Sequence, residues 1–260
     1  MSRPHQDDPH SPDAEPGRQD QSPPPPPWGR ARKRPAPARV PLTRDRIVDA
    51  AYVVLDREGY DGLSMRQVAT ELGVAVSALY AHVTSKDDLL QMMYERLFID
   101  HEPPEPDPAR WQEQIKEYAV EWRRRLLGHR DMARISVAQM PFTPDLLATT
   151  EKLFAIFRAA GLPDEIAATA GDIMATYVDG FSYEESMWQE RQREADAADW
   201  SEMSHTLRTY FASLPPDRFP TLVALSGQMF HRNNDDRFLL GLDILLRGLA
   251  SYIPRDDGPR

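Results

Sequence analysis

Apolar side chains recur every three or four residues along most of the chain beyond residue 42, which is the spacing of one face of an α-helix. Capping residues and glycines divide the first part of this pattern into four short segments. The residues that would begin or end these helices are Thr43, Gly59, Ser64, Gly73 and Ser85. The pattern predicts a small domain of α-helices over residues 42–100.

The helical spacing resumes after a proline-rich link at residues 101–110. The periodic segments are 111–127, about 131–139, 144–160, 164–193, 201–213 and 235–252. Alternating patterns bounded by hairpin turns, which would indicate strands, are absent from the sequence. We therefore predict an all-α fold, with a larger helical domain over 101–254 and a short tail over 255–260.

The first 41 residues differ in texture, because they hold twelve of the 24 prolines of the chain. Such a segment buries too little apolar surface to offset its ordering entropy, so residues 1–41 are predicted to be a disordered arm. Acidic residues come first, and a basic cluster follows. The basic residues are Arg30, Arg32, Lys33, Arg34 and Arg39. This cluster is either a solvated tail or an arm that adds phosphate or minor-groove contacts.

Charge and composition limit the possible functions. The chain has 31 basic and 41 acidic side chains, a net charge of −10, so any contact with nucleic acid requires a local basic patch on an acidic body. The absence of cysteine from the sequence excludes disulfide scaffolds, thiolate metal sites and cysteine nucleophiles. No apolar run reaches membrane-spanning length, and the N-terminus lacks the apolar core of a signal peptide. We expect a cytoplasmic protein with no membrane partner.

The most informative stretch is 63–86, where two short helices are joined by a turn that begins with Gly73. The outward face of the second helix is small and uncharged, as a helix that enters the major groove requires. Its residues are Ala75, Val76, Ser77, Ala78, Tyr80 and Ala81. Any αα-hairpin with a glycine turn gives a similar pattern. Groups that reach phosphates follow closely and favour DNA binding. They are Tyr80, His82, Thr84, Ser85 and Lys86.

The order D-G-L-S-x-R-x-V-A, then L-G-V, then L-Y-x-H-V-x-x-K resembles the DNA-binding domain of TetR-family repressors. The segments WQEQIKEYAVEWRRRLLGHRD and RFLLGLDILLRGL, and the residues around DGFSYEE, are similar to the C-terminal domain of the tetracycline-repressor branch. This resemblance covers about 42–252. It implies a three-helix helix-turn-helix domain followed by a ligand-binding and dimerisation domain. It also implies a non-enzymatic repressor that binds a palindromic operator as a homodimer and is released by a small-molecule effector.

The resemblance assigns roles to individual residues of the helix-turn-helix. Arg66 lies where these repressors place a base-reading arginine, and arginine bidentate to guanine is the commonest specific contact. The other residues assigned to DNA binding are Ser64, Val76, Ser77, Ala78, Tyr80, His82 and Lys86. Of these, Tyr80, His82 and Lys86 match backbone-contacting positions. Because Val76 and Ala78 are apolar, base readout would rely on thymine methyl groups and DNA shape, and the operator sequence cannot be named.

The resemblance also places a ligand pocket between the proline-rich link and the helices around 111–184. The candidate lining residues are His101, Trp111, Gln114, Ile135, Gln139, Met140, Phe142, Phe154, Tyr177 and Glu184. Ser136 stands where the tetracycline repressor has its magnesium-binding histidine, and serine is a poor substitute for it. We therefore expect neither a magnesium–tetracycline ligand nor any other metal or cofactor. His101 and Glu184 match drug-site positions, but ordinary surface or bundle positions would also explain them.

Two apolar stripes, at 166–181 and 238–249, are either core or the helices through which family members pair. Two recognition helices set about 34–36 Å apart would match successive half-sites of an operator.

Other functions fit the sequence less well. His129-Arg130-Asp131 is similar to a kinase catalytic loop, but Ser136 stands where that loop needs asparagine. The run HRNNDDR at 231–237 lacks the glycine and glutamate of a calcium loop and is interpreted as the loop before the last helix. A DNA-binding architectural protein without an effector remains an alternative.

Overall fold

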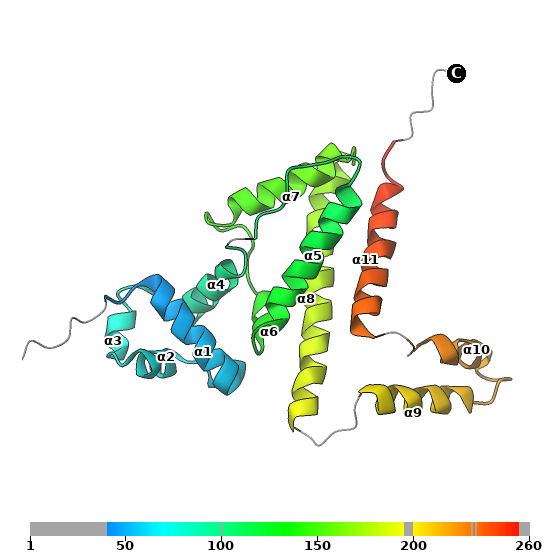
Figure 1. The fold of residues 1–260 in the computed structure, drawn as a ribbon, viewed down its shortest axis with the longest axis horizontal. Coiled ribbons are helices and arrows are strands. Elements are labelled where there is room, and N and C mark those ends of the chain that lie inside the picture. Colours follow the sequence, from blue (N-terminus) through cyan, green and yellow to red (C-terminus); the bar gives the residue numbers. More distant parts are fainter. Residues whose placement is uncertain (1–40, 100, 195–199, 230, 232, 255–260) are drawn as a thin grey trace, which may run out of the picture. The chain divides into compact units, whose positions relative to one another are not determined.

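The computed structural model describes residues 41–99, 101–194, 200–229, 231 and 233–254. The predicted arm, apart from Pro41, and the tail at 255–260 lie outside the described residues. The described residues form α-helices and no strand, which confirms the all-α class (Figure 1). The helices are α1 (Arg44–Gly62), α2 (Met65–Leu72), α3 (Val76–Leu79), α4 (Lys86–Arg96), α5 (Trp111–Leu127), α6 (Met132–Ser136), α7 (Leu147–Ala159), α8 (Asp164–Glu194), α9 (Trp200–Ala212), α10 (Pro220–Met229) and α11 (Asn234–Ala250).

Helices α1, α2 and α4 begin at the predicted caps. The side-chain oxygens of Thr43, Ser64 and Ser85 each accept a hydrogen bond from the backbone N–H three residues later, at 3.3, 3.3 and 3.0 Å. These bonds satisfy donors that the first turn of a helix leaves unpaired. The helices bury a common apolar core. Its fully buried members include Ile47, Ala51, Val54, Leu55, Val68, Leu79, Leu89 and Met93.

Helix α1 does not stop at Gly59, as the sequence predicted, but kinks there and continues to Gly62. Gly59 has φ 72° and ψ 179°, a backbone conformation that only glycine adopts without strain. The kink separates the last turn of α1 from the rest of the helix. That last turn contacts the segment that leads into α6, as described below.

The larger helical part is built around α8, which is 31 residues long. Helices α5, α6, α7 and α11 pack against α8, and α5 also contacts α6, α7 and α11 (Figure 1). Two helices are shorter than predicted. Helix α6 ends at Ser136, and α7 begins at Leu147 because residues 143–146 form a turn, in which the Leu146 N–H donates to the Thr143 carbonyl at 2.9 Å.

Helices α9 and α10 pack against each other. The sequence analysis missed α10, because the apolar residues of Pro220–Met229 are consecutive and form no stripe. Pro220 at the first helical position was the available signal. The interpretation of 231–237 as a loop is wrong for its last four residues. Helix α11 begins at Asn234, since the Asn233 side chain accepts the Asp236 N–H at 2.8 Å and caps the helix.

Candidate nucleic-acid interface and ligand site

Helix α3 presents small side chains to solvent. Gly73, in the left-handed conformation with φ 66°, ends α2 and turns the chain toward α3. Leu79 is fully buried and anchors α3, whereas Ser77 is exposed and Tyr80 is 53% exposed. Val76 and Ala78 are half-buried, and Val76 packs against the core. Of the predicted base-facing residues, Ser77 is therefore the most accessible.

The other residues assigned to DNA binding surround this helix. Arg66 is exposed in the first turn of α2, and the hydroxyl of Ser64 caps the same helix. His82 is half-buried, and its backbone carbonyl accepts a hydrogen bond from Arg44 Nε at 3.1 Å. The ammonium group of Lys86 is already engaged, because it donates to the Tyr60 carbonyl at 3.3 Å and lies 4.6 Å from the centre of the Tyr60 ring.

Tyr60, in the last turn of α1, is a meeting point between α4 and the start of α6. Its backbone N–H donates to Asp131 Oδ2 at 2.8 Å, and the guanidinium of Arg134 lies 4.1 Å from its ring centre. Arg134 also pairs with Asp61 at 3.2 Å. Two cations, Lys86 and Arg134, therefore contact one aromatic ring, an arrangement that each cation–π contact stabilises. We call Tyr60, together with the side chains of Asp61, Lys86, Asp131 and Arg134, the Tyr60 joint.

Further polar contacts join α1 to the segment before α6. Asp56 Oδ1 accepts the Arg130 N–H at 3.0 Å, and His129 Nδ1 lies 2.9 Å from Asp56 Oδ2. Arg130 in turn forms an ion pair with Glu190 of α8. The end of α1 is thus connected through residues 129–131 to the central helix of the larger part.

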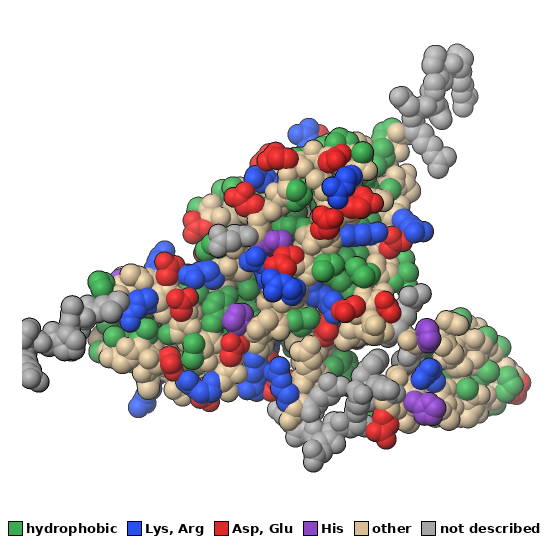
Figure 2. Space-filling view, viewed as in Figure 1, with side chains coloured by type: hydrophobic (Ala, Val, Ile, Leu, Met, Phe, Trp, Pro, Cys, Tyr) green, Lys and Arg blue, Asp and Glu red, His purple; other side chains and the backbone are tan. Residues whose placement is uncertain are grey.

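Acidic and basic side chains are interspersed on the face of the molecule shown in Figure 2. This mixture agrees with the net charge of −10, which leaves little long-range attraction for a polyanion. Any affinity of the described residues for a nucleic acid must therefore come from short-range contacts, and the surroundings of α3 are the candidate surface.

Two small apolar cavities lie between α4, α5, α7 and α8. The first has a volume of about 40 Å³ and the second about 30 Å³. They share three lining residues, Tyr118, Trp122 and Leu153. The first cavity is also lined by Tyr94, Phe98, Pro141, Leu146, Thr149 and Thr150, and the second by Ile115, Ala119, Phe157, Gly171, Met174 and Val178.

A buried polar pair lies near these cavities. Ser136, at the end of α6, is 2% exposed, and its hydroxyl donates to Asp179 Oδ1 at 3.1 Å. Burial raises the pKa of Asp179 from its usual 3.8 to about 7, and the bond from Ser136 opposes this rise. Ser136, which stands where the tetracycline repressor has its magnesium-binding histidine, thus donates a hydrogen bond to a carboxyl group. Among the described residues, no group of three or more His, Asp or Glu side chains is placed to hold a metal ion.

The predicted ligand residues do not line either of these two cavities, and their role stays a prediction. His101 contacts a residue that lines both cavities, because its ring stacks on Tyr118 with centroids 4.3 Å apart. Burial lowers the pKa of His101, and a hydrogen bond with the Tyr118 carbonyl partly opposes this. Phe142 and Met140 are mostly exposed, and Gln139 is half-buried. Phe154 packs so closely on Gly171 that a Cβ there would lie 2.9 Å from its ring.

Other predicted ligand residues have structural contacts. Gln114 is buried and holds the proline-rich link, since its Nε2 donates to the Glu105 carbonyl at 2.7 Å and its Oε1 accepts the Asp107 N–H at 3.0 Å. Trp111 is buried edge-on against Phe157, and Ile135 is in the core.

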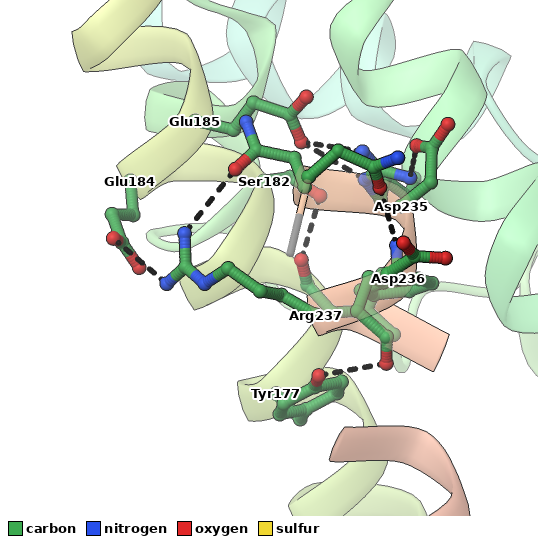
Figure 3. Close-up of polar contacts among 12 residues, drawn as sticks. Tyr177, Ser182, Glu184, Glu185, Asp235, Asp236 and Arg237 are labelled. Atoms are coloured by element: carbon green, nitrogen blue, oxygen red, sulfur yellow. Dashed lines mark hydrogen bonds and ion pairs between the residues drawn. The ribbon is translucent and has the colours of Figure 1, made fainter. Parts of the chain in front are cut away.

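Tyr177 and Glu184 lie at the contact between α8 and α11, as Figure 3 shows. The Tyr177 hydroxyl donates to the Phe238 carbonyl at 2.9 Å, and Glu184 accepts a hydrogen bond from Arg237 at 3.2 Å. Glu185, next in the chain, pairs with the buried Arg123 of α5 at 2.8 Å (Figure 3). Tyr177 and Glu184, both predicted to line a ligand pocket, thus connect α8 to α11.

The sequence analysis missed the aromatic residues that line the cavities. Tyr118 and Trp122 are one helical turn apart in the segment 111–127, which the sequence analysis used only to predict a helix. The position of cavities along such a helix depends on the facing helices, which a single sequence does not place. Asp179 had no such signal, because its helical neighbours three and four residues away form no apolar stripe; they are Ala175, Thr176, Ser182 and Tyr183.

The comparisons with known proteins agree with this arrangement. Residues 47–93 match the family of bacterial regulatory proteins of the tetR family, and residues 103–253 match the tetracyclin repressor-like C-terminal domain. No helix in the described part of the chain is sufficiently long and apolar to span a bilayer.

Several individual proteins are similar over most of the chain. The structure of ActR from Streptomyces coelicolor in complex with actinorhodin has 40% sequence identity and a TM-score of 0.74, covering 83% of this chain and 100% of its own. An HTH-type transcriptional regulator of Saccharopolyspora erythraea is 32% identical, over 81% of this chain and 85% of its own length. The HTH-type transcriptional repressor DrrR1 of Streptomyces coeruleorubidus is 29% identical, over 89% and 86%. The chain therefore belongs to the TetR family of bacterial transcriptional regulators, with a C-terminal domain of the tetracycline-repressor type.

Proposed function

We propose that this protein is a transcriptional repressor that binds a palindromic operator as a homodimer and leaves it when a small-molecule effector binds the larger helical part. Among its relatives, DrrR1 is named a repressor, and ActR has been crystallised with actinorhodin. The observation that carries the proposal is the exposure of Ser77 and Tyr80 on a slim helix whose other side is anchored by the buried Leu79.

Pairing of two copies is supported by apolar side chains left exposed on two neighbouring helices. Leu240 and Ile244 of α11 are 42% and 62% exposed, and Ile173 of α8 is 38% exposed. Leu240 and Ile244 are one helical turn apart, so they share a face. Burying this face in a four-helix bundle of α8 and α11 from two subunits removes it from water, which favours association.

A short path of contacts connects the cavities to the DNA-binding helices. Asp179 follows the cavity-lining Val178, and Ser136 joins Asp179 to α6. Helix α6 is only five residues long, and Asp131, which precedes it, contacts Tyr60. An effector that displaces α8 side chains therefore shifts α6 and the Tyr60 joint together. An effector that binds only the arrangement of the joint that does not fit the operator depletes the other arrangement, and so lowers the affinity of the protein for the operator.

The test is a selection of bound sequences from random duplex DNA, followed by titration of the selected duplex. We expect a palindromic site that binds two subunits, and release of the duplex by a compound that raises the melting temperature of the protein. Stoichiometry of one subunit per duplex would contradict the homodimer. If a library of hydrophobic compounds produced no shift of the melting temperature, an architectural DNA-binding role without an effector would be favoured instead.

A further inference from the structure

Two open grooves adjoin each other along α5, apart from the small cavities described above. The first groove has a volume of about 620 Å³ and lies between α5, α8 and α11. The second has a volume of about 470 Å³ and lies between α5 and the helices α1 and α4. Arg124 and Gly128 line both grooves, so the two meet at the end of α5. Volumes of this size are typical of sites for small molecules.

The first groove presents an apolar wall. Its charged pair is internally satisfied, because the buried Arg123 forms ion pairs with Glu185 at 2.8 Å and with Asp235 at 2.7 Å. Figure 2 shows hydrophobic side chains gathered over α5 and α11, next to a group of basic ones. An apolar chain that covers this wall would remove it from water, which favours binding. The apolar lining residues are Val120, Leu127, Phe238 and Leu239.

The second groove has a basic wall. Apart from Tyr52, every titratable residue that lines it is basic, and no described carboxylate is among the lining residues. On α5 a single carboxylate, that of Glu121, pairs with both Arg124 and Arg125, which leaves an excess of positive charge there. The basic lining residues are Arg96, Arg124, Arg125 and His129.

The carboxylates that pair with Arg96 can be replaced at little cost. They belong to Asp45 and Asp49, whose side chains are 79% and 64% exposed. Ion pairs as exposed as these contribute little to stability. A phosphate or carboxylate of a ligand can therefore compete with them, and arginine binds such groups through two parallel hydrogen bonds.

The first groove is distinct from the proposed dimer face. Leu239 precedes Leu240 by one residue, which corresponds to about 100° around the helix. A bundle formed through Leu240 and Ile244 therefore leaves Leu239 at its side. Leu239 and Val120 are 44% and 39% exposed, and both line the groove.

We propose that the two grooves form one site for an anionic amphiphile, a single-chain compound whose apolar part lies in the first groove and whose anionic group binds the arginines of the second. The ligand is a dissolved molecule and not a bilayer, because the apolar wall is recessed between helices. The site is separate from the cavities between α4, α5, α7 and α8, so it adds a second ligand to those of the proposed repressor.

The experiment is calorimetry on the full chain with octyl phosphate, below its micelle-forming concentration. Octan-1-ol and inorganic phosphate are the comparison ligands, since each retains one half of its chemistry. The wild type should bind octyl phosphate at least about tenfold more tightly than either, because only this compound combines apolar burial with a charge-assisted hydrogen bond.

Two exposed residues test the two halves of the site. Arg124→Gln should weaken octyl phosphate binding about five- to tenfold and leave octan-1-ol binding unchanged. Leu239→Ser should weaken the binding of both compounds about threefold or more. The matched controls are Arg110→Gln, whose arginine is 60% exposed and pairs with Glu117, and Leu225→Ser, whose leucine is 49% exposed on α10. Both controls should bind octyl phosphate as the wild type does.

Three results would overturn the proposal. The first is equal affinity of the wild type for octyl phosphate and octan-1-ol, or wild-type affinity in Arg124→Gln. The second is dissociation of the dimer by Leu239→Ser in sedimentation, which would show that a second copy of the chain covers the first groove. The third is binding to vesicles of anionic phospholipid without binding to octyl phosphate, which would identify a membrane surface. None of these measurements involves the operator, so their failure leaves the proposed function standing.

Discussion

At the scale of single residues, Asp179 is the titratable group whose environment most affects its chemistry at neutral pH. Burial raises its pKa from 3.8 to about 7, and Ser136 is its hydrogen-bond donor. In the folded protein it keeps its proton up to about pH 7, whereas in the unfolded chain it ionises above about pH 4. The stability that the neutral carboxyl contributes is therefore complete at low pH and is lost as the pH rises from about 4 to 7.

Asp179→Asn should remove this pH dependence while keeping an oxygen that accepts the Ser136 bond. The rise of about three pKa units corresponds to at most roughly 4 kcal/mol. We expect the variant to gain about 2–4 kcal/mol over the wild type at pH 8 and little at pH 4. Urea unfolding of both proteins at the two pH values measures this. An equal difference at pH 4 and pH 8 would contradict the assignment.

Arg66 and Lys86 should contribute differently to DNA binding. Arg66→Ala should reduce the free energy of operator binding by about 1–3 kcal/mol and relax the preference at one base position. Lys86→Ala should weaken binding to all DNA sequences and reduce the slope of log affinity against log salt concentration by about one. Binding to the selected operator and to single-base variants, over a range of salt concentrations, distinguishes them. The control is Lys152 of α7, whose ammonium group lies 2.7 Å from a carboxylate oxygen of Glu102. Its replacement by alanine should change neither the base preference nor the salt slope. An unchanged base preference in Arg66→Ala would remove its role in readout.

At the scale of elements, the helix ends were the most predictable feature. Thr43, Ser64, Gly73 and Ser85 all act as the sequence predicted, because caps depend on local backbone geometry. At Gly59 the sequence predicted the end of a helix, but it did not predict the last turn beyond the kink, where the Tyr60 N–H donates to Asp131, far along the chain. The two apolar cavities lie among the helices where the sequence placed a ligand pocket, but they are lined by other residues than those it named. Which aromatic residue of α5 faces a cavity depends on how α7 and α8 pack against it.

The kink of α1 should be sensitive to a single methyl group. A Cβ at Gly59 would lie 2.9 Å from Asp131 Oδ2, which already accepts the Tyr60 N–H, and the backbone conformation there strongly disfavours alanine. Gly59→Ala should therefore destabilise the protein by about 2–4 kcal/mol. The matched control is Gly73→Ala, where φ is also positive but no described atom lies within 4 Å of the added Cβ. It should cost only about 1 kcal/mol. Equal losses in chemical denaturation would argue against a close contact at the kink.

At the scale of the whole molecule, the proposed function requires two recognition helices held at a fixed distance. One α3 helix offers few side chains to DNA, so the proposed repressor would need a dimer that places two of them in successive major grooves. The exposed apolar face of α8 and α11 is where the proposed dimer forms. The Tyr60 joint lies between this part of the molecule and α3, where it can change the orientation of the recognition helix.

Ile244→Glu should therefore dissociate the dimer, because it places a charge in the centre of the proposed apolar interface. Val53→Glu is the matched control, since Val53 is 47% exposed on α1. Sedimentation should show a monomer for Ile244→Glu and a dimer for Val53→Glu and the wild type. The monomeric variant should also lose most of its operator affinity. A dimer that persists in Ile244→Glu would place the interface elsewhere.

The most direct test of the account is the affinity of the full chain for its selected operator, measured by fluorescence anisotropy for the wild type, Ser77→Glu and Ser213→Glu. Both serines are exposed, but only Ser77 lies on α3. A carboxylate at position 77 would face the base edges and phosphates, so Ser77→Glu should weaken binding by at least about a hundredfold, whereas Ser213→Glu should bind as the wild type does. Equal binding by all three proteins, or a wild type that binds no duplex at low salt, would contradict the central claim that α3 reads DNA.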